Sequence, residues 1–265
     1  MDNRPIGMFD SGIGGLTVLK EVQKALPNEK IIYLGDTKRF PYGSKSKEAI
    51  IEISRKCVEF LISKDVKMII IACGTATSQS LEVLQKEYSV PIVGIIEPTV
   101  LYLRESIKKE NARIGVIATS GTIRSGAWEN KIKEKMPKVE VINEDAPLLA
   151  TMAEQGWTNN KVAKYTVKEY MKCFKKIDKL ILGCTHYPLF KELIEKELKG
   201  KTEIINTGTR VAYYVSRYIE DNDIKNDEKK GSVEIYLTDM DSNFKEKATK
   251  LLGDNIQYSI AKAEF

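Results

Sequence analysis

Short apolar runs alternate along this chain with longer segments in which apolar residues recur at helical spacing. Ile6 to Asp10 and Ile31 to Leu34 predict two buried strands. A helix over Leu16 to Leu26 is predicted between them, and Glu48 to Ser63 is predicted to form a second helix. Strands that alternate with helices in this way indicate an α/β fold with parallel sheets.

The pattern repeats further along the chain. Ile114 to Gly121 resembles Ile6 to Gly12 at an offset of 108 residues (114 − 6). Val139 to Ile142 corresponds to the second predicted strand, Ile31 to Leu34, at the same offset (139 − 31). Two apolar runs end in cysteines, Lys67 to Cys73 and Asp178 to Cys184, and these cysteines are 111 residues apart (184 − 73). Three landmarks in the same order at nearly the same offset predict two similar halves.

We therefore expect an α/β fold of two pseudo-symmetric three-layer lobes with mainly parallel sheets and the active site in the cleft between them. Residues 1–97 together with 208–265 are predicted to form the first lobe, and residues 98–207 the second. In open α/β sheets, ligands bind outside the carboxyl ends of the strands. A ligand between two facing lobes would therefore meet strand ends from both.

Composition and charge narrow the class of protein. The segment from Met1 to Pro5 lacks the apolar core of a signal peptide, and no apolar run is long enough to span a membrane, so we expect a cytoplasmic protein without membrane contact. The net charge is +5, but Lys and Glu are interleaved, as in Lys191 to Glu197, which is typical of a solvated helix face. A nucleic-acid partner is therefore not expected. Four cysteines without a Cys-x-x-Cys pair indicate free thiols, with no disulfide framework and no metal site.

Cys73 and Cys184 would then reach one ligand from opposite sides. Inverting a stereocentre next to a carboxylate requires a base on one face of the carbon and an acid on the other. Thiols suit both roles, because a cysteine pKa of about 8.5 is lowered at a helix N-terminus or beside a cation. Each sulfur must approach the carbon within about 3 to 3.5 Å, which places the two sulfurs roughly 7 Å apart. The matched thiols predict a two-base reaction.

Two further segments fit an amino-acid pocket. The stretch from Asp10 to Gly15 opens a helix, so its glycines permit close backbone approach and its free N–H groups can hold an anion, while Asp10 could bind an ammonium group. This stretch fails the G-x-G-x-x-G fingerprint at its sixth position, and no phosphate-binding G-x-x-x-x-G-K-[ST] loop occurs. Pro41 to Ser44 is a turn whose N–H groups and Tyr42 phenol could receive a second carboxylate.

Each candidate thiol has a candidate helper, Asp10 for Cys73 and His186 for Cys184. His186 is the only histidine of the chain and lies two positions after Cys184, where it would tune the charge of that thiol. Structural roles stay open beside these functional ones. Asp10 could serve as a helix N-cap, and Tyr42 could pack in its turn.

Several motifs, spread from the first strand to the last third of the chain, resemble those of one enzyme family. They are Asp10 to Thr17, Gly35-Asp36-Thr37, Pro41-Tyr42-Gly43, Ala72-Cys73 with Thr75-Ala76-Thr77, and Leu182 to Leu189. In this order they resemble the glutamate racemases, a cofactor-independent family of the aspartate/glutamate racemase superfamily that supplies D-glutamate for bacterial peptidoglycan. The last motif is the most specific.

The resemblance implies interconversion of L- and D-glutamate without a cofactor, with Cys73 and Cys184 as the two acid/base thiols. In the family the first cysteine acts on the D-enantiomer and the second on the L-enantiomer. The residues implied to surround the amino-acid substrate are Asp10, Ser11, Tyr42, Gly43, Thr75, Thr185 and His186. Glu154, which follows Pro147-Leu148-Leu149, resembles the family glutamate that assists the second cysteine. Members are commonly homodimers, so a homodimer is expected.

One position departs from the family pattern. The family usually has Cys-Asn-Thr where this chain has Cys73-Gly74-Thr75. The asparagine amide is expected to bind the substrate's amino-acid head, whereas Gly74 offers only its backbone. Losing such a contact costs roughly 0.5 to 1.5 kcal/mol, so we expect weaker binding with the chemistry retained.

Three alternatives remain open from the sequence. An aspartate racemase of the same superfamily also uses two cysteines, although Pro41-Tyr42-Gly43 and Cys184 to Tyr187 favour glutamate. A pyridoxal-phosphate racemase needs a Schiff-base lysine and a phosphate cradle, and neither is evident in the sequence. A non-catalytic two-lobe amino-acid-binding protein would have inert thiols and would exchange no proton at the α-carbon.

Overall fold

The computed structural model describes residues 1–228, 230–240, 242–253 and 256–265, in which helices and strands alternate from end to end. The strands are β1 (Ile6–Asp10), β2 (Ile31–Gly35), β3 (Met68–Ile71), β4 (Ile92–Gly94), β5 (Arg113–Ala118), β6 (Glu140–Asp145), β7 (Lys179–Leu182), β8 (Glu203–Asn206), β9 (Val233–Leu237) and β10 (Tyr258–Lys262). The α-helices are α1 (Leu16–Ala25), α2 (Lys47–Ile62), α3 (Gly74–Glu87), α4 (Ile96–Ser106), α5 (Ser120–Arg124), α6 (Ala127–Lys135), α7 (Pro147–Glu154), α8 (Lys161–Tyr170), α9 (Lys191–Glu197), α10 (Thr207–Asp221) and α11 (Phe244–Leu252). Within these described residues, no helix is both long enough and apolar enough to cross a membrane.

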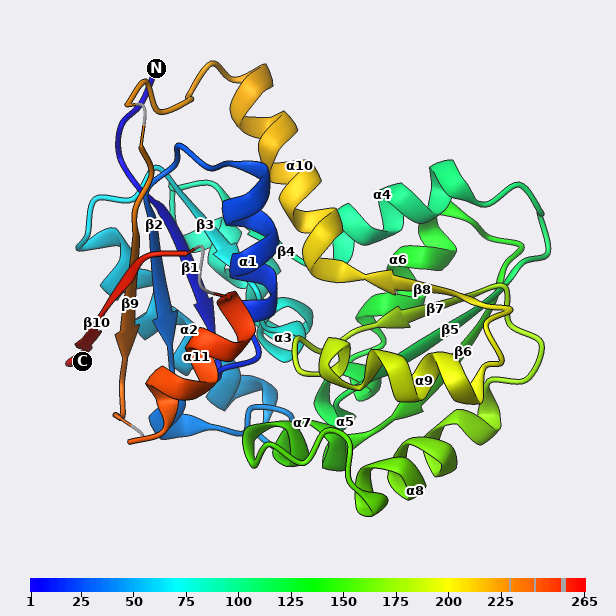
Figure 1. The fold of residues 1–265 in the computed structure, drawn as a ribbon. Coiled ribbons are helices and arrows are strands. Elements are labelled where there is room, and N and C mark those ends of the chain that lie inside the picture. Colours follow the sequence, from blue (N-terminus) through cyan, green and yellow to red (C-terminus); the bar gives the residue numbers. More distant parts are fainter. Residues whose placement is uncertain (229, 241, 254–255) are drawn as a thin grey trace.

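The strands form two sheets that lie side by side (Figure 1). The first sheet has the order β10-β9-β2-β1-β3-β4, and the second has the order β6-β5-β7-β8. Each pair of neighbouring strands runs parallel. The β2-β1-β3-β4 part of the first sheet has the same order as the whole second sheet, which confirms the predicted pseudo-symmetric α/β architecture. β9 and β10 extend the first sheet beyond β2, so the C-terminal segment adds to the sheet that the N-terminal segment begins.

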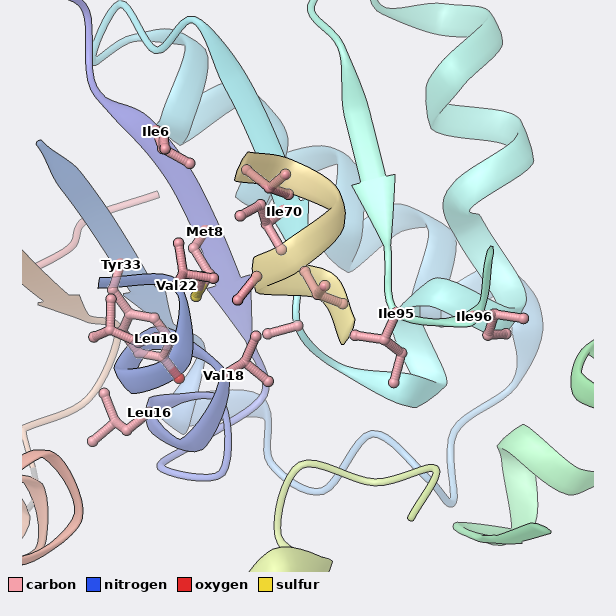
Figure 2. Close-up of a cluster of buried hydrophobic side chains, with 14 of the residues drawn as sticks. Ile6, Met8, Leu16, Val18, Leu19, Val22, Tyr33, Ile70, Ile95 and Ile96 are labelled. Atoms are coloured by element: carbon pink, nitrogen blue, oxygen red, sulfur yellow. The ribbon is translucent and has the colours of Figure 1, made fainter. Parts of the chain in front are cut away.

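Side chains alternate between the two faces of the first sheet, and helices cover both faces. On one face, Leu16, Leu19 and Val22 of α1 pack towards Met8 of β1 and Tyr33 of β2 (Figure 2). The opposite face belongs to a second cluster, in which residues of β1 and β3 meet α2 and α3. Burial on both faces explains why these strands are apolar along their whole length and not only at alternate positions.

The second sheet is also covered on both faces. Leu180 and Leu182 of β7 belong to a cluster with α7, α8 and α9. Ile181 points to the other face, where Trp128 and Ile132 of α6 complete the layer. This last cluster is continuous with the α1 side of the first sheet, because α10 packs on both α1 and α4 (Figure 1). One hydrophobic core therefore joins the two halves.

The ends of the elements follow local signals, with small differences from the sequence prediction. α1 ends at Ala25, shortly before Pro27, and α2 begins after Ser46, whose hydroxyl accepts a hydrogen bond from the Ala49 N–H at 3.2 Å. β6 is longer than the predicted Val139 to Ile142, because its pairing with β5 continues through Asp145. Tertiary pairing here overrides a weak local pattern.

Candidate active site

The carboxyl ends of the central strands of both sheets open into one cavity of about 400 Å³. In each half the first strand lies between the second and the third. The chain therefore continues from the first strand (β1 or β5) and from the third strand (β3 or β7) towards opposite faces of the sheet, and a crevice forms at the carboxyl ends of these strands. The side chains that line the cavity from the first sheet include Ser11, Cys73 and Thr75, and those from the second include Thr119, Cys184 and His186. Both cysteines singled out in the sequence therefore border the same space.

Cys73 lies at the N-cap of α3, two residues after the end of β3. Its sulfur is 3.9 Å from the Ser11 hydroxyl oxygen. Burial raises the pKa of the Cys73 thiol well above its usual value, and the charge of Asp10 raises it further, while the Ala76 backbone N–H at the start of α3 lowers it. A thiol with a raised pKa is neutral near pH 7, so Cys73 can donate a proton.

Cys184 lies beside a coupled pair of ionisable groups. His186 Nδ1 is 3.7 Å from the Cys184 sulfur, and His186 Nε2 is 2.7 Å from Glu154 Oε1. Burial by itself lowers the pKa of His186, but its contacts with Cys184 and Glu154 outweigh burial and raise that pKa well above the usual value. A protonated imidazole donates from both nitrogens, so it can hold negative charge on the Cys184 sulfur.

Glu154 also joins the two halves of the molecule. It ends α7, and its Oε1 accepts a hydrogen bond from the Ile13 N–H at 3.1 Å. A Cβ at Gly12 would overlap with this carboxylate oxygen. The glycines after β1 therefore allow Glu154, from the other half of the molecule, to lie close to the backbone that follows β1.

Asp10 lies beneath the cavity wall, with a fully buried carboxylate. One oxygen accepts the Gly12 N–H at 3.0 Å, and the other accepts the Thr185 hydroxyl at 3.1 Å. Burial raises the pKa of Asp10, and the charge of His186 opposes this shift. Asp10 is not among the described residues that line the cavity, so its binding of a substrate ammonium group stays a prediction. Its hydrogen bond orients the Thr185 hydroxyl at the cavity wall.

The turn after β2 lines the cavity with Tyr42 and Gly43. The Tyr42 phenol is buried and donates a hydrogen bond to Asp36 Oδ2 at 2.6 Å, and its contact with a substrate carboxylate stays a prediction. Gly43 borders the cavity, and its carbonyl accepts the Gly121 N–H from the other half at 2.9 Å. A Cβ at Gly43 would meet the Thr119 side chain at 2.6 Å, so this crossing requires glycine.

The cavity also includes residues that the sequence reasoning missed. Thr119 lines the cavity, and its hydroxyl is 2.8 Å from that of Thr75. Thr119 lies 108 positions after Ser11 (119 − 11), so the internal repeat itself carried a signal for it. Arg124 is the one Lys, Arg, Asp or Glu side chain among the described residues that line the cavity, and no pattern in the sequence pointed to it.

No group of three or more His, Cys, Asp or Glu side chains in the described parts of the chain is arranged to hold a metal ion. Glu154 and His186 are instead paired with each other, and Asp10 accepts hydrogen bonds from a backbone N–H and a hydroxyl.

Comparisons with known proteins agree with this architecture. The family profile described as Asp/Glu/Hydantoin racemase matches residues 7–212. A glutamate racemase from Geobacter metallireducens is 39% identical over 256 residues, which cover 96% of this chain and 94% of the relative.

Two solved structures are similar over essentially the full length. The glutamate racemase from Francisella tularensis, in complex with D-glutamate, has a TM-score of 0.92 and 36% identity, with 100% of this chain and 98% of that chain covered. The glutamate racemase from Bacillus anthracis has a TM-score of 0.94 and 34% identity, with 100% and 99% covered. These matches confirm the resemblance that the motifs carried. The chain belongs to the Asp/Glu/hydantoin racemase family, with glutamate racemases as its full-length relatives.

Proposed function

We propose that this protein is an isomerase that interconverts L-glutamate and D-glutamate by a two-thiol mechanism that uses no cofactor. The observation that carries the proposal is that Cys73 and Cys184, delivered by equivalent strands of two sheets, border one cavity. A substrate between them would present opposite faces of its α-carbon to the two sulfurs. The relatives that match nearly the full chain are glutamate racemases, and one was solved with D-glutamate bound.

In the L-to-D direction, the Cys184 thiolate removes the α-proton, and the C–H electron pair stays on the α-carbon as a carbanion. The Cys73 thiol then delivers its proton to the opposite face. Cys184 leaves the turnover as a thiol and Cys73 as a thiolate, and D-glutamate reacts with the protein in that second state. The assignment of Cys184 to the L-enantiomer follows the family resemblance and fits the imidazolium beside this sulfur.

The substrate's charges also have partners around the cavity. The side chain of Arg124 can pair with a carboxylate at the mouth, because no ion pair in the described structure engages it. The Thr185 hydroxyl donates to Asp10, so its oxygen can accept a hydrogen bond from the substrate ammonium group. The Thr75 hydroxyl and the backbone N–H groups at the start of α3 can donate to the α-carboxylate, and such donors stabilise the negative charge that develops when the α-proton leaves. We propose Ser11, Gly43 and Gly74 as the neighbouring wall of the substrate site.

The same proposal extends to the organisation of the protein. Residues 1–97 with 208–265 form one lobe and residues 98–207 the other, with α4 and α10 crossing these borders as connecting helices. The resemblance also supports a homodimer in the cytoplasm that supplies D-glutamate for peptidoglycan.

The decisive experiment is racemisation of purified protein with no added cofactor, followed by circular dichroism, with L-glutamate, D-glutamate and L-aspartate in parallel. We expect loss of optical activity with both glutamate enantiomers and a much slower change with aspartate. Faster reaction with aspartate would instead assign the site to the aspartate branch of the family. Binding of glutamate without deuterium uptake at the α-carbon in D2O would show a binding protein with inert thiols.

A further inference from the structure

The segments that carry the two cysteines touch through their backbones. A Cβ built on Gly74 would overlap with the carbonyl oxygen of Gly183 and would lie 3.3 Å from its carbonyl carbon. The obstacle is main chain, so it cannot rotate away as a flexible side chain can. Any residue other than glycine at position 74 must therefore move one segment relative to the other.

Gly183 has little room to retreat from that contact. Its N–H donates a hydrogen bond to the Ile117 carbonyl at 2.8 Å. A Cβ on Gly183 would lie 2.9 Å from Trp128 Nε1 and 3.0 Å from the Ala118 Cβ, so its Cα is also closely covered. Gly183 is thus held by β5 and α6 of its own half while its carbonyl faces Gly74 of the other half.

The position of this contact connects it to the chemistry. Gly74 follows Cys73 directly, and Gly183 directly precedes Cys184. The two glycines thus bring the end of β3 and the end of β7 together with no side chain between them. The approach of the two cysteine segments is set at this point.

We propose that Gly74 is a positioning residue that sets the separation of the Cys73 and Cys184 sulfurs. This inference rests on the proposed racemisation. The absent Cβ lets the Gly183 carbonyl lie against the Gly74 backbone, and that contact keeps both sulfurs within reach of one α-carbon. The glycine therefore does more than omit a substrate contact, since a larger residue here would widen the gap between the thiols.

Gly74→Ala tests this role with the smallest possible Cβ. Displacements of about 1 Å at a reacting centre can cost on the order of 100-fold in rate, so we expect kcat to fall about 10- to 100-fold with KM changed only a few-fold. The diagnostic readout is the ratio of α-proton exchange to inversion in D2O. The thiol that removes the α-proton can exchange its hydrogen with D2O. If the opposite thiol is too distant, the carbanion more often takes a deuteron back from the first thiol, so exchange without inversion increases and this ratio rises. Gly74→Asn is expected to behave like Gly74→Ala and to gain no affinity for glutamate.

Two further variants serve as controls. Ala118→Gly removes the methyl group that covers Gly183, so the double variant Gly74→Ala/Ala118→Gly is expected to recover part of kcat and to lower the exchange-to-inversion ratio. Gly7→Ala adds a methyl group at another buried glycine of the first sheet, where it meets Val66 methyl groups at 3.2 Å. We expect Gly7→Ala to lower the melting temperature and to leave the ratio at its wild-type value.

Each outcome decides between the hypotheses. A Gly74→Ala protein with the wild-type ratio would overturn the positioning role, whether or not its kcat falls. If Gly74→Ala does not fold, the double variant is compared with Ala118→Gly alone, and equal ratios would overturn the role in the same way. If the wild-type protein does not racemise glutamate, the proposed function itself is refuted. That outcome is distinct from an unchanged ratio in the Gly74 variants, which would overturn only the positioning role.

Discussion

Cys73 and Cys184 occupy equivalent places in two similar halves, yet their surroundings differ. Cys73 is next to a neutral hydroxyl, that of Ser11, and burial with the Asp10 charge raises the pKa of its thiol. Cys184 is next to His186, whose own pKa is raised by the sulfur and by Glu154 in spite of burial. A repeated backbone thus supplies the matched geometry, and under the proposed mechanism the unmatched neighbours favour Cys73 as the acid and Cys184 as the base in the L-to-D direction.

The difference cannot appear as a faster overall reaction in one direction. L- and D-glutamate have the same free energy, so kcat/KM must be equal for the two enantiomers in every variant. The asymmetry must instead be sought in the individual proton transfers, which α-proton exchange and substrate isotope effects report separately.

Removing either thiol gives the largest expected effect. Cys73→Ala and Cys184→Ala are each expected to lower inversion by at least about 10³-fold, because one face of the carbanion loses its proton donor or acceptor. Exchange in D2O should then separate the sites. Cys184→Ala is expected to exchange the α-proton of D-glutamate and not of L-glutamate, and Cys73→Ala the reverse.

The matched control is Cys57→Ala, at a buried thiol on α2 that lies outside the cavity. Loss of exchange with both enantiomers in both active-site variants, with Cys57→Ala unaffected, would mean that the thiols do not act as separate bases. The comparison of two independent sites would then fail.

Glu154→Gln is expected to weaken only the Cys184 site. The substitution removes a charge that raises the pKa of His186, so the imidazolium beside Cys184 is lost at a lower pH. We expect a roughly tenfold lower kcat/KM for both enantiomers at neutral pH. The substrate deuterium isotope effect should rise with α-deuterated L-glutamate and fall with α-deuterated D-glutamate, because proton transfer at Cys184 becomes slower in both directions.

The pH profile provides a second check on the same variant. A folded-state pKa above the unfolded value of about 6.5 means that the stabilising charge on His186 is fully present below that value and is lost as the pH rises through the folded pKa. The wild-type rate should therefore decline at alkaline pH, and the decline should move to lower pH in Glu154→Gln. Glu169→Gln, at an exposed pair with Lys172, is the control. An unchanged pH profile in Glu154→Gln would show that the charge on His186 does not control the reactivity of Cys184.

Arg124→Gln should have a smaller effect that is the same for both enantiomers. Arg124 has no counterpart in the first half, where the equivalent position (124 − 108) is Leu16. Loss of a charged hydrogen-bond partner is expected to raise KM about tenfold for both enantiomers with kcat nearly unchanged. The dependence of KM on salt should also weaken, since the long-range attraction for the substrate's carboxylates is removed. An effect on one enantiomer alone would show that Arg124 acts at one of the thiols.

The sequence predicted the parts of this site that depend on strand ends. Cys73, Cys184 and Ser11 follow central strands of parallel sheets, so the fold brings them to one edge, and the repeat made the second sheet predictable from the first. Contacts between the halves were less predictable. Glu154 is 141 residues from the Ile13 N–H that it binds, and Arg124 reaches the cavity from the end of a short helix.

Gly74 shows why a motif departure needs the three-dimensional structure. The sequence shows only that Gly74 lacks the amide group that an asparagine side chain would offer a substrate. Its contact with the Gly183 carbonyl depends on how closely two distant segments pack. No local pattern encodes that distance.

Tyr42→Phe gives the smallest expected effect on catalysis and sharpens the description of the Cys73 side. The phenol donates to Asp36, which also accepts hydrogen bonds from Arg39 at 2.7 Å and from the Thr238 hydroxyl at 2.8 Å. The Tyr42 hydroxyl thus helps to attach the segment after β9 to the first sheet, because it shares Asp36 with Thr238. We expect kcat and KM to stay within about twofold, while the free energy of unfolding falls by about 1 to 3 kcal/mol because a buried carboxylate oxygen loses a donor. Urea unfolding and racemisation of the same preparation measure both quantities. A rise in KM with unchanged stability would show that the phenol contacts the substrate, and the Cys73 side would then present a polar group that Cys184 lacks.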